Sequence, residues 1–371
     1  MVVSLGDFIT SQQNDCEYPH AARIEQKVPV YDGNQLRNLS IEQMAAVGRE
    51  WAECWLHGAG IIAISAFYAE DETVNAMTRS MLRLLEIEQR DKNAIGDHFA
   101  GQGANKRLWN ALEKTAVEGP QTFIDYYQNP LLGAVSEAWL GPGYQVTAQV
   151  NLVPPGSSAQ EPHRDYHLGF QTDKEVERYP LHVQTMSPLL TLQGAVAHVD
   201  MPVESGPTRV LPCSQRYESG YQLYRQEDFK AYFEEHAVQI PMALGDAAFF
   251  NPAVMHGAGA NNSADVQRIV NLLQISSPFG IPMETIDHDR VQLTCYEALQ
   301  KSPPQGNALE TLATVISDSY PFPTNLDRDV PGSSLAPTSS KQLLLNALEK
   351  GWEKSRFKHA LEDYRWRRCS A

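Results

Sequence analysis

The chain has 371 residues, of which 45 are acidic and 30 are basic, giving a formal charge of −15 at pH 7. This balance argues against sequence-independent nucleic-acid binding, which requires a basic surface. The five cysteines are widely spaced and form no CxxC pair, so we expect free thiols in the reducing cytoplasm. No apolar run approaches about 18 residues, so we expect no membrane span, and we expect no signal peptide.

The N-terminal part of the chain predicts two helices and one strand. The capping-box pattern SIEQ begins a helix at Ser40, and Gly58 is a suitable end for it. The apolar run GIIAIS at 60–65 predicts a short buried strand. A second helix is expected from Asp71 to Gln89, where apolar side chains recur at helical spacing.

The pattern changes after the glycine-rich stretch GDHFAGQGANKRLWN. From about 145 to 280 the chain carries short β-rich segments that are separated by turn residues. Evenly spaced short strands are typical of an antiparallel sandwich or jelly roll. The segments are YQVTAQVNLV, LLTLQGAVAHV, TRVLP, HAVQIPM, DAAFFNP and RIVNLLQIS.

The C-terminal part returns to helical patterns, interrupted by SPPQG, YPFPT and PGSSLAPTSS. A final helix is expected from Ser340, with Leu344, Leu348 and Trp352 on one face. Its end is rich in Lys and Arg, which predicts a solvated or packing face. The alternatives for this face are closing the active site and forming a homodimer.

These patterns divide the chain into three predicted parts. Residues 1–39 form an N-terminal arm, and residues 40–280 form the domain that carries the strands. Residues 281–371 form a helical extension, which is also the candidate homodimer surface.

The segment QEPHRDYHLG contains His163, Asp165 and His167 at alternating positions. In an extended strand, residues i and i+2 point to the same face, so His163 and Asp165 can share one cation. The preceding VPPGSSAQEP excludes a helix and fits a loop that leads into a strand. His167 would lie about 13 Å from His163 along an ideal strand, so we expect it to be no ligand. An HxD pair alone is a weak signal and is more typical of a polar strand face than of a metal site.

A second motif follows in GDAAFFNPAVMHGAGANNSADVQRIVNLL, where His256 ends an apolar β-run. Arg268 then begins a strand among apolar residues, and an arginine in such a place needs an anionic partner. Two histidines and one carboxylate form the facial triad of non-haem Fe(II) oxygenases. His163, Asp165 and His256 can form this set, and a metal-bound 2-oxoglutarate would supply the anion for Arg268.

From Ser40 to Pro278 the chain resembles the phytanoyl-CoA dioxygenase family of Fe(II)/2-oxoglutarate oxygenases. In the motif ESGPTRVLPCSQR (204–216), this chain has Cys213 and Gln215 where the family has Gly and His. This departure lies in a loop and alters no expected metal ligand. The resemblance rests on HRD, on ESGPTRVLPCSQR, and on GDAAFFNPAVMHGAGANNS followed by Arg268.

The resemblance implies a mainly β fold with flanking helices (α+β), built on a double-stranded β-helix core of the jelly-roll, cupin-like type. It implies Fe(II), 2-oxoglutarate and O2 as cofactor and cosubstrates. It assigns iron to His163, Asp165 and His256, and 2-oxoglutarate to Arg268. Further contacts to 2-oxoglutarate are suggested for Asn151, Gln160, Thr208 and Arg107.

Two other groups of residues have competing interpretations. Lys106 and Arg107 lie where the family uses a basic residue near 2-oxoglutarate or substrate, and solvated surface is the alternative. His198 and Asp200 form another HxD pair. By the resemblance, this pair ends a strand, so we expect Asp200 to accept hydrogen bonds from backbone donors in a turn.

The resemblance implies an oxidoreductase that hydroxylates, desaturates or rearranges a small organic substrate and releases succinate and CO2. A natural-product intermediate and an acyl compound are both compatible with it. Family members that halogenate have Ala or Gly at the carboxylate position, which Asp165 fills here. The alternatives are a zinc hydrolase that uses the same triad, in which Arg268 has no role, and a catalytically silent, cupin-like binding protein.

Overall fold

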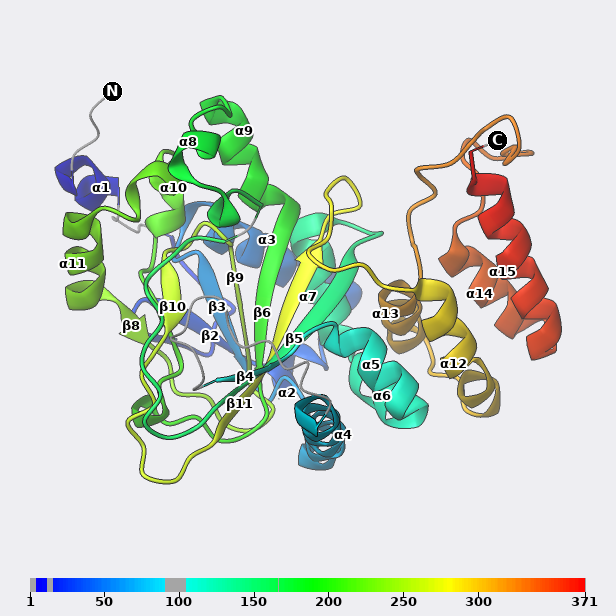
Figure 1. Ribbon diagram of the computed structural model, residues 1–371, viewed down its shortest axis with the longest axis horizontal. Coiled ribbons are helices and arrows are strands. Elements are labelled where there is room, and N and C mark those ends of the chain that lie inside the picture. The colour runs from blue at the N-terminus through cyan, green and yellow to red at the C-terminus, as the bar shows by residue number, and fades with distance from the viewer. Residues whose placement is uncertain (1–4, 12–15, 91–104, 166, 371) are drawn as a thin grey trace.

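The computed structural model describes residues 5–11, 16–90, 105–165 and 167–370. An eight-stranded mixed sheet and a three-stranded sheet form its centre, and helices flank the large sheet (Figure 1). This agrees with the expected combination of sheet and flanking helices. Helical residues outnumber strand residues in the described part, so "mainly β" describes the core and not the chain. No described helix is long and apolar enough to cross a membrane.

The large sheet has the strand order β1-β2-β3-β9-β6-β11-β5-β4. Strands β2 and β3 are parallel, and all other neighbours are antiparallel. The predicted strands of this sheet are thereby confirmed. Its strands are β1 (Arg23–Glu25), β2 (Val28–Asp32), β3 (Ile61–Ser65), β4 (Lys106–Leu108), β5 (Gln145–Val153), β6 (Thr191–Ala197), β9 (Ala247–Phe250) and β11 (Arg268–Ser276).

The small sheet has the order β10-β7-β8 and is antiparallel. Its strands are β7 (Thr208–Val210), β8 (Val238–Gln239) and β10 (His256–Ala258). Two of the predicted β-rich segments, TRVLP and HAVQIPM, contribute β7 and β8. The short strand β10 carries His256 at its first position, and the His256 side chain lines the cavity that is described below.

The N-terminal helices agree with their sequence signals. Helix α3 (Ile41–His57) begins after Ser40, whose hydroxyl accepts from the backbone N–H of Gln43 in the predicted capping box. The Gln43 side chain in turn accepts from the Ser40 backbone N–H. Helix α4 (Asp71–Arg90) also matches its expected range. The remaining helices of this part are the short α1 (Leu5–Ser11) and α2 (Gly33–Leu36).

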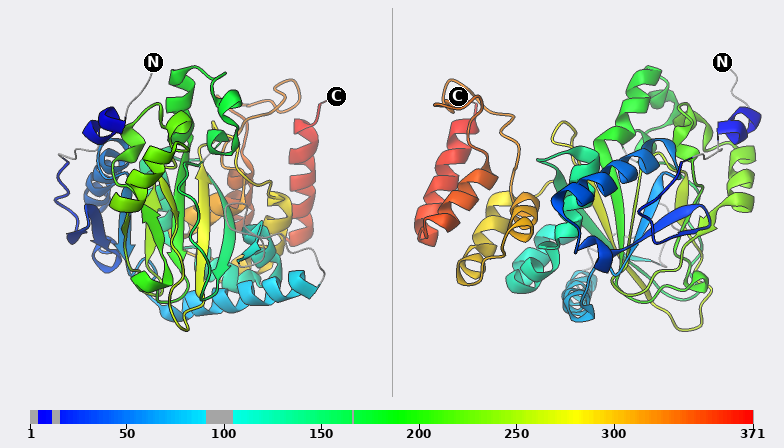
Figure 2. Two further views of the ribbon diagram at one scale, coloured as in Figure 1. Left: turned by 60° about the vertical axis from the view of Figure 1, so that its left-hand side comes forward. Right: turned by 180° about the vertical axis from the view of Figure 1, so that it is seen from behind.

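The other helices form two groups. Helices α5, α6 and α7 pack between the sheet and the C-terminal helices, which stack at one side of the molecule (Figure 1). Figure 2 shows the C-terminal helices on the side of the molecule away from α10 and α11. The helices that follow α4 are α5 (Ala111–Glu118), α6 (Pro120–Tyr127), α7 (Pro130–Leu140), α8 (Asp173–Val176), α9 (Leu181–Met186), α10 (Gly220–Leu223), α11 (Glu227–His236), α12 (His288–Lys301), α13 (Asn307–Ile316), α14 (Ser340–Glu349) and α15 (Lys354–Arg368).

Two local expectations are wrong. The expected final helix is two helices, because Gly351 adopts a left-handed backbone conformation with φ of 58° between α14 and α15. The HRD segment is not a strand: only His163 forms an isolated bridge, and His167 begins a short 3-10 helix, His167–Phe170. His167 itself has φ of 43°, which is incompatible with a continuing strand.

Candidate active site

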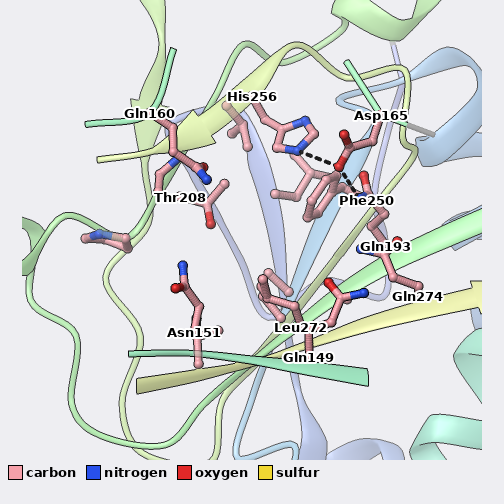
Figure 3. Close-up of a pocket in the computed structure, with 18 of the residues that line it drawn as sticks. Gln149, Asn151, Gln160, Asp165, Gln193, Thr208, Phe250, His256, Leu272 and Gln274 are labelled. Atoms are coloured by element: carbon pink, nitrogen blue, oxygen red, sulfur yellow. Dashed lines mark hydrogen bonds and ion pairs between the residues drawn. The ribbon is translucent and has the colours of Figure 1, made fainter. Parts of the chain in front are cut away.

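A cavity of about 330 Å³ lies between the two sheets and contains the predicted site residues. Its wall on the large sheet follows the alternation of the strands, since Val270, Leu272 and Gln274 of β11 share one face. Strands β7 and β10 form the facing wall. Figure 3 shows side chains from both walls converging on it. Its polar and charged lining residues are Arg107, Gln149, Asn151, Gln160, His163, Asp165, Gln193, Thr208, His256, Arg268 and Gln274.

His163, Asp165 and His256 form a buried cluster at this cavity. His163 Nε2 lies 3.9 Å from Asp165 Oδ1, and His256 Nε2 lies 3.7 Å from Asp165 Oδ2. One potential ligand atom from each residue lies within 4.8 Å of the other two. Two imidazole nitrogens and one carboxylate oxygen are the donor set of a facial triad. The three residues can therefore hold one metal ion.

Backbone pairing brings the two histidines together although they are far apart in the chain. The backbone N–H of His163 donates to the His256 carbonyl at 2.8 Å, and the reverse hydrogen bond is 2.9 Å. The backbone N–H of Asp165 donates to the Pro252 carbonyl at 3.1 Å. The local shape of the HRD segment thus comes from pairing with the segment around β10, rather than from a strand of its own.

Two backbone carbonyls determine which imidazole nitrogens face the cluster. His163 Nδ1 lies 2.8 Å from the Glu161 carbonyl oxygen, and His256 Nδ1 lies 2.8 Å from the Val254 carbonyl oxygen. A carbonyl oxygen only accepts, so each Nδ1 carries the proton. Each Nε2 then presents a lone pair toward the cluster, which is the state that a metal ligand requires.

Asp165 is held from two sides. Gln193 Nε2 donates to its Oδ2 at 2.6 Å, and the Tyr221 hydroxyl donates to its backbone carbonyl at 2.6 Å. Burial by itself raises the pKa of this carboxyl, but the contacts with His256, His163 and Gln193 outweigh burial. The pKa of Asp165 consequently lies below its ordinary value, and the group stays a carboxylate.

Arg164, between the two ligands of the HRD segment, points away from the cluster. Its guanidinium is fully buried and donates to the backbone carbonyls of Ser214 and Tyr217. It also lies over the Tyr221 ring, 5.7 Å from the centroid. Arg164 therefore ties the ligand-bearing segment to the loop that contains Ser214 and Tyr217. The sequence reasoning did not assign it a role.

Arg268 is a buried cation at the start of β11. Its Nη1 donates to the carbonyls of Ser205 at 2.8 Å and Gly259 at 3.2 Å, and the residue is 3% exposed. Burial lowers the pKa of Arg268 to about 10, which still leaves it charged at neutral pH. In the described part of the chain, no carboxylate forms an ion pair with it. A buried charge in this situation favours an anionic ligand.

The other predicted contacts all line the cavity. Gln160 pairs with Ala258 through its backbone N–H and through its Oε1, which accepts from the Ala258 N–H at 2.8 Å. Asn151 is buried, and its Oδ1 has no hydrogen-bond partner in the described part of the chain. Thr208 begins β7 and pairs with Ala258 in the ladder. Arg107 lines the cavity and lies over the Trp109 ring, 4.9 Å from the centroid.

Four residues that could be confused with ligands lie elsewhere. Lys106 is exposed and donates to Gln89 Oε1 at 3.1 Å, so it is the surface member of the Lys106–Arg107 pair. Asp200 accepts from the Leu244 backbone N–H at 2.8 Å, as expected of a residue that satisfies a backbone donor. His198 is buried outside the cavity lining, and His167 is absent from the metal-competent cluster found among the described residues.

Sequence reasoning missed the contribution of β6 and β9 to the site. Gln193 contacts Asp165, and the Phe250 ring lies 4.8 Å from the His256 ring between centroids. Gln193 occupies an ordinary strand position outside the quoted motifs, whereas Phe250 lies within GDAAFFNP but was assigned no role. Their alternation with buried neighbours predicts an inward face, but nothing local in the sequence indicates which segment they face.

Comparison with known proteins identifies the family of this chain. Dioxygenase FrzG of Cladobotryum sp is 26% identical over 223 residues, which cover 56% of this chain and 68% of that protein. Dioxygenase andF of Emericella variicolor is 31% identical over 144 residues, covering 38% of this chain and less than half, 45%, of that protein.

Among solved structures, the non-haem alpha-ketoglutarate-dependent carbocyclase SnoK from nogalamycin biosynthesis is 19% identical, with a TM-score of 0.45. That match covers 66% of this chain and 86% of SnoK. The profile described as phytanoyl-CoA dioxygenase (PhyH) matches residues 56–270, more than half of the chain. The chain therefore belongs to the phytanoyl-CoA dioxygenase (PhyH) family.

Proposed function

We propose that this protein is an Fe(II)- and 2-oxoglutarate-dependent dioxygenase that oxidises a small organic substrate and releases succinate and CO2. Hydroxylation is the favoured outcome. One observation carries the proposal: a buried His-Asp-His cluster and a buried arginine without a carboxylate partner line the same cavity. Family membership supports it, and both curated relatives are named dioxygenases.

The donor set fits iron. His163 and His256 would ligate through Nε2 and Asp165 through a carboxylate oxygen, since Asp165 Oδ1 is buried and no described residue forms a hydrogen bond with it. A facial set of three protein ligands leaves positions for a cosubstrate and for O2. When bound, the iron and 2-oxoglutarate supply the oxidising chemistry, and the protein supplies ligation and orientation.

Arg268 fits the far carboxylate of 2-oxoglutarate. Its Nη1 is used by two backbone carbonyls, which hold the guanidinium in place without neutralising it. A guanidinium can then pair with a carboxylate through two parallel hydrogen bonds. Asn151 and Thr208 are the neighbouring polar groups that would orient the cosubstrate, with Arg107 as a further cation nearby.

The protein's own residues would hold the reacting groups and limit the access of water. Gln193 and Tyr221 hold Asp165, and the two histidines are held through their Nδ1 protons. Phe250, Leu272 and Met283 add apolar surface to the cavity wall. A rigid, largely apolar wall favours a single orientation of the substrate C–H bond relative to the metal.

The architecture that we propose for this site is a double-stranded β-helix. The mixed large sheet and the small sheet enclose the cavity, and antiparallel pairing dominates both, which supports that assignment. We retain the proposed division into an arm (1–39), a dioxygenase domain (40–280) and a helical extension (281–371). The helices of the extension share one continuous buried core with the rest of the chain.

The test is succinate formation by the full chain with Fe(II), 2-oxoglutarate and O2. We expect the wild-type protein to convert 2-oxoglutarate to succinate, and Asp165→Ala to abolish this conversion while circular dichroism shows an intact fold. Asp200→Ala is the matched control, because Asp200 belongs to the other HxD pair and bonds to Leu244 instead. Near wild-type succinate formation by Asp165→Ala contradicts the proposal.

The same preparation distinguishes the proposed oxygenase from the alternative, a zinc hydrolase. That protein would release no succinate with Fe(II) and would hydrolyse an ester probe when loaded with zinc. Its mechanism gives Arg268 no function, so the affinity for 2-oxoglutarate would not depend on this residue. Hydrolysis with zinc, together with absence of succinate with Fe(II), overturns the oxygenase proposal.

A further inference from the structure

Two glutamines on the large sheet form an unassigned polar pair beside the metal cluster. Gln193 of β6 and Gln274 of β11 are direct partners in the antiparallel ladder, so their side chains lie next to each other. Both line the cavity (Figure 3) and are only 3% and 5% exposed. The Oε1 atom of each is buried and has no hydrogen-bond partner among the residues that the structure describes.

The orientation of the Gln193 amide follows from chemistry. Asp165 Oδ2 only accepts hydrogen bonds, so the nitrogen of Gln193 must face it, at 2.6 Å. Its carbonyl oxygen is then turned away from the metal ligand and is left as an acceptor. A buried acceptor without a donor is unfavourable, which means that a ligand supplying a donor gains affinity here.

The pair lies at the end of the cavity opposite to Arg268. Gln274 lies six positions after Arg268 in β11, which corresponds to about 20 Å along a strand. A five-carbon dicarboxylate that extends from the metal to Arg268 would therefore run away from Gln274 rather than toward it. In the register, Asn151 pairs with Val270 and Arg107 pairs with Asn151, so both lie toward the Arg268 end and not at the glutamine end.

The glutamine end contains no charged residue apart from the metal ligand Asp165. Among the described lining residues, the only charged side chains outside the His-Asp-His cluster are Arg107 and Arg268. The surfaces near the pair are neutral, including Leu272 and Phe250, which face Gln149 and Gln193 across their ladders. A charged substrate group would be buried there without a partner, which is strongly unfavourable.

We propose that Gln193 and Gln274 form a substrate subsite that accepts a hydrogen bond from a hydroxyl group of an uncharged, mainly apolar substrate. This inference rests on the proposed function, because it assigns the Arg268 end to 2-oxoglutarate. It names the substrate class as a neutral hydroxylated molecule rather than an anionic one. Gln193 would also couple substrate position to the metal ligand, since one amide contacts both.

The experiment compares two probes that differ in a single donor, 1-naphthol and 1-methoxynaphthalene. Their dissociation constants are measured by calorimetry on the full chain loaded with Fe(II) and 2-oxoglutarate without oxygen. One hydrogen bond predicts a preference for 1-naphthol of roughly 2- to 12-fold, equivalent to about 0.5–1.5 kcal/mol. We expect Gln193→Leu and Gln274→Leu each to remove most of this preference.

Gln149→Leu is the matched control. Gln149 is a buried glutamine of the same cavity, but its amide donates to Met283 Sδ at 3.2 Å, so the preference should persist in this variant. Equal affinity of both probes for the wild-type protein, or no binding of either, overturns the subsite. Persistence of the preference in both the Gln193 and Gln274 variants also overturns it.

The result is separable from the proposed function. Succinate formation without a preference for 1-naphthol would leave the dioxygenase proposal intact and remove the subsite. A preference that depends on the two glutamines, in a protein that forms no succinate, would support the subsite and contradict the dioxygenase.

Discussion

Each histidine of the metal cluster donates its Nδ1 proton to the carbonyl of the residue two positions earlier in the chain. This arrangement selects Nε2 of His163 and of His256 as ligand atoms. His167 lies outside the cluster, because it begins a 3-10 helix that follows the ligand-bearing segment. Ligand function is therefore decided by the backbone around each side chain and not by the histidine itself.

The metal assignment predicts different outcomes for two alanine variants. His256→Ala removes one of three ligands, so its loss of Fe(II) affinity should exceed the roughly 10- to 100-fold that changes of outer-shell partners cost. His167→Ala should bind Fe(II) like the wild-type protein. Equilibrium dialysis without oxygen measures both. Retained binding in the first variant and lost binding in the second would mean that the HRDYH segment forms the site alone.

The assignment of Arg268 predicts a selective loss of 2-oxoglutarate affinity. Removal of one partner from a buried charge pair typically costs about 2–5 kcal/mol, or roughly 30- to several-thousand-fold. Arg268→Leu should show this loss while Fe(II) affinity changes little. The control is Lys106→Leu, because Lys106 is an exposed cation bonded to Gln89. Unchanged 2-oxoglutarate affinity in Arg268→Leu would mean that Arg107 binds the far carboxylate instead.

At the scale of elements, basic residues at the end of α15 attach this helix to the segment between α13 and α14. The carboxylate of Asp329 is buried and accepts from Arg367 Nε at 3.0 Å and from Thr324 at 2.8 Å. Arg368 approaches the same carboxylate at 3.5 Å and also donates to two proline carbonyls. Helix α15 thereby holds the segment between α13 and α14, which supports the packing interpretation of its basic residues.

This attachment can be tested by removing its acidic member. Hydrogen bonds to charged groups contribute about 1.5–3 kcal/mol each, so Asp329→Ala should lower the midpoint of urea unfolding and speed proteolysis between α13 and α14. Succinate formation should persist, because no described residue beyond Met283 lines the cavity. Asp327→Ala, an exposed aspartate of the same segment, is the control. Equal protease resistance in both variants would contradict the attachment.

At the scale of the whole molecule, His198 joins three layers of the fold. Its Nδ1 lies 2.7 Å from the Thr78 hydroxyl of α4, and its Nε2 lies 2.9 Å from the Tyr126 hydroxyl of α6. The Thr78 hydroxyl donates to the Val74 carbonyl, so it accepts from Nδ1, and the Tyr126 hydroxyl donates to Nε2. The imidazole is thus neutral, and burial lowers the pKa of His198 to about 3.

This pKa predicts how stability depends on pH. Between about pH 6.5 and 3 the unfolded chain binds a proton that the folded chain excludes, so the free energy of unfolding decreases as the pH falls. The loss at about pH 5 should be about 2 kcal/mol relative to about pH 7.5. Urea midpoints should show a weaker pH dependence in His198→Gln, and an unchanged one in the exposed control His182→Gln. Identical pH dependence in all three proteins would contradict this role.

The sequence by itself determined the features that depend on neighbours in the chain. The capping box at Ser40 begins α3 because its hydrogen bonds join residues three positions apart. Short β-rich segments between turn residues predicted β5, β6 and β11 in the same way, because strand propensity and turn signals are local. The HRD motif and the later His256 and Arg268 indicated a family whose membership the comparisons confirm. The ligand roles stay predictions.

Tertiary structure decided which of these side chains meet. The HRD segment takes its shape from pairing with His256, and Gln193 reaches Asp165 from another strand, so no local pattern encodes either contact. The break at Gly351 was missed although glycine commonly ends helices, because Leu344, Leu348 and Trp352 keep helical spacing across it. Burial supplies the physical reason: the register of β6 and β11 places Gln193 beside Gln274, and desolvation makes Arg268 and the amide oxygens require partners.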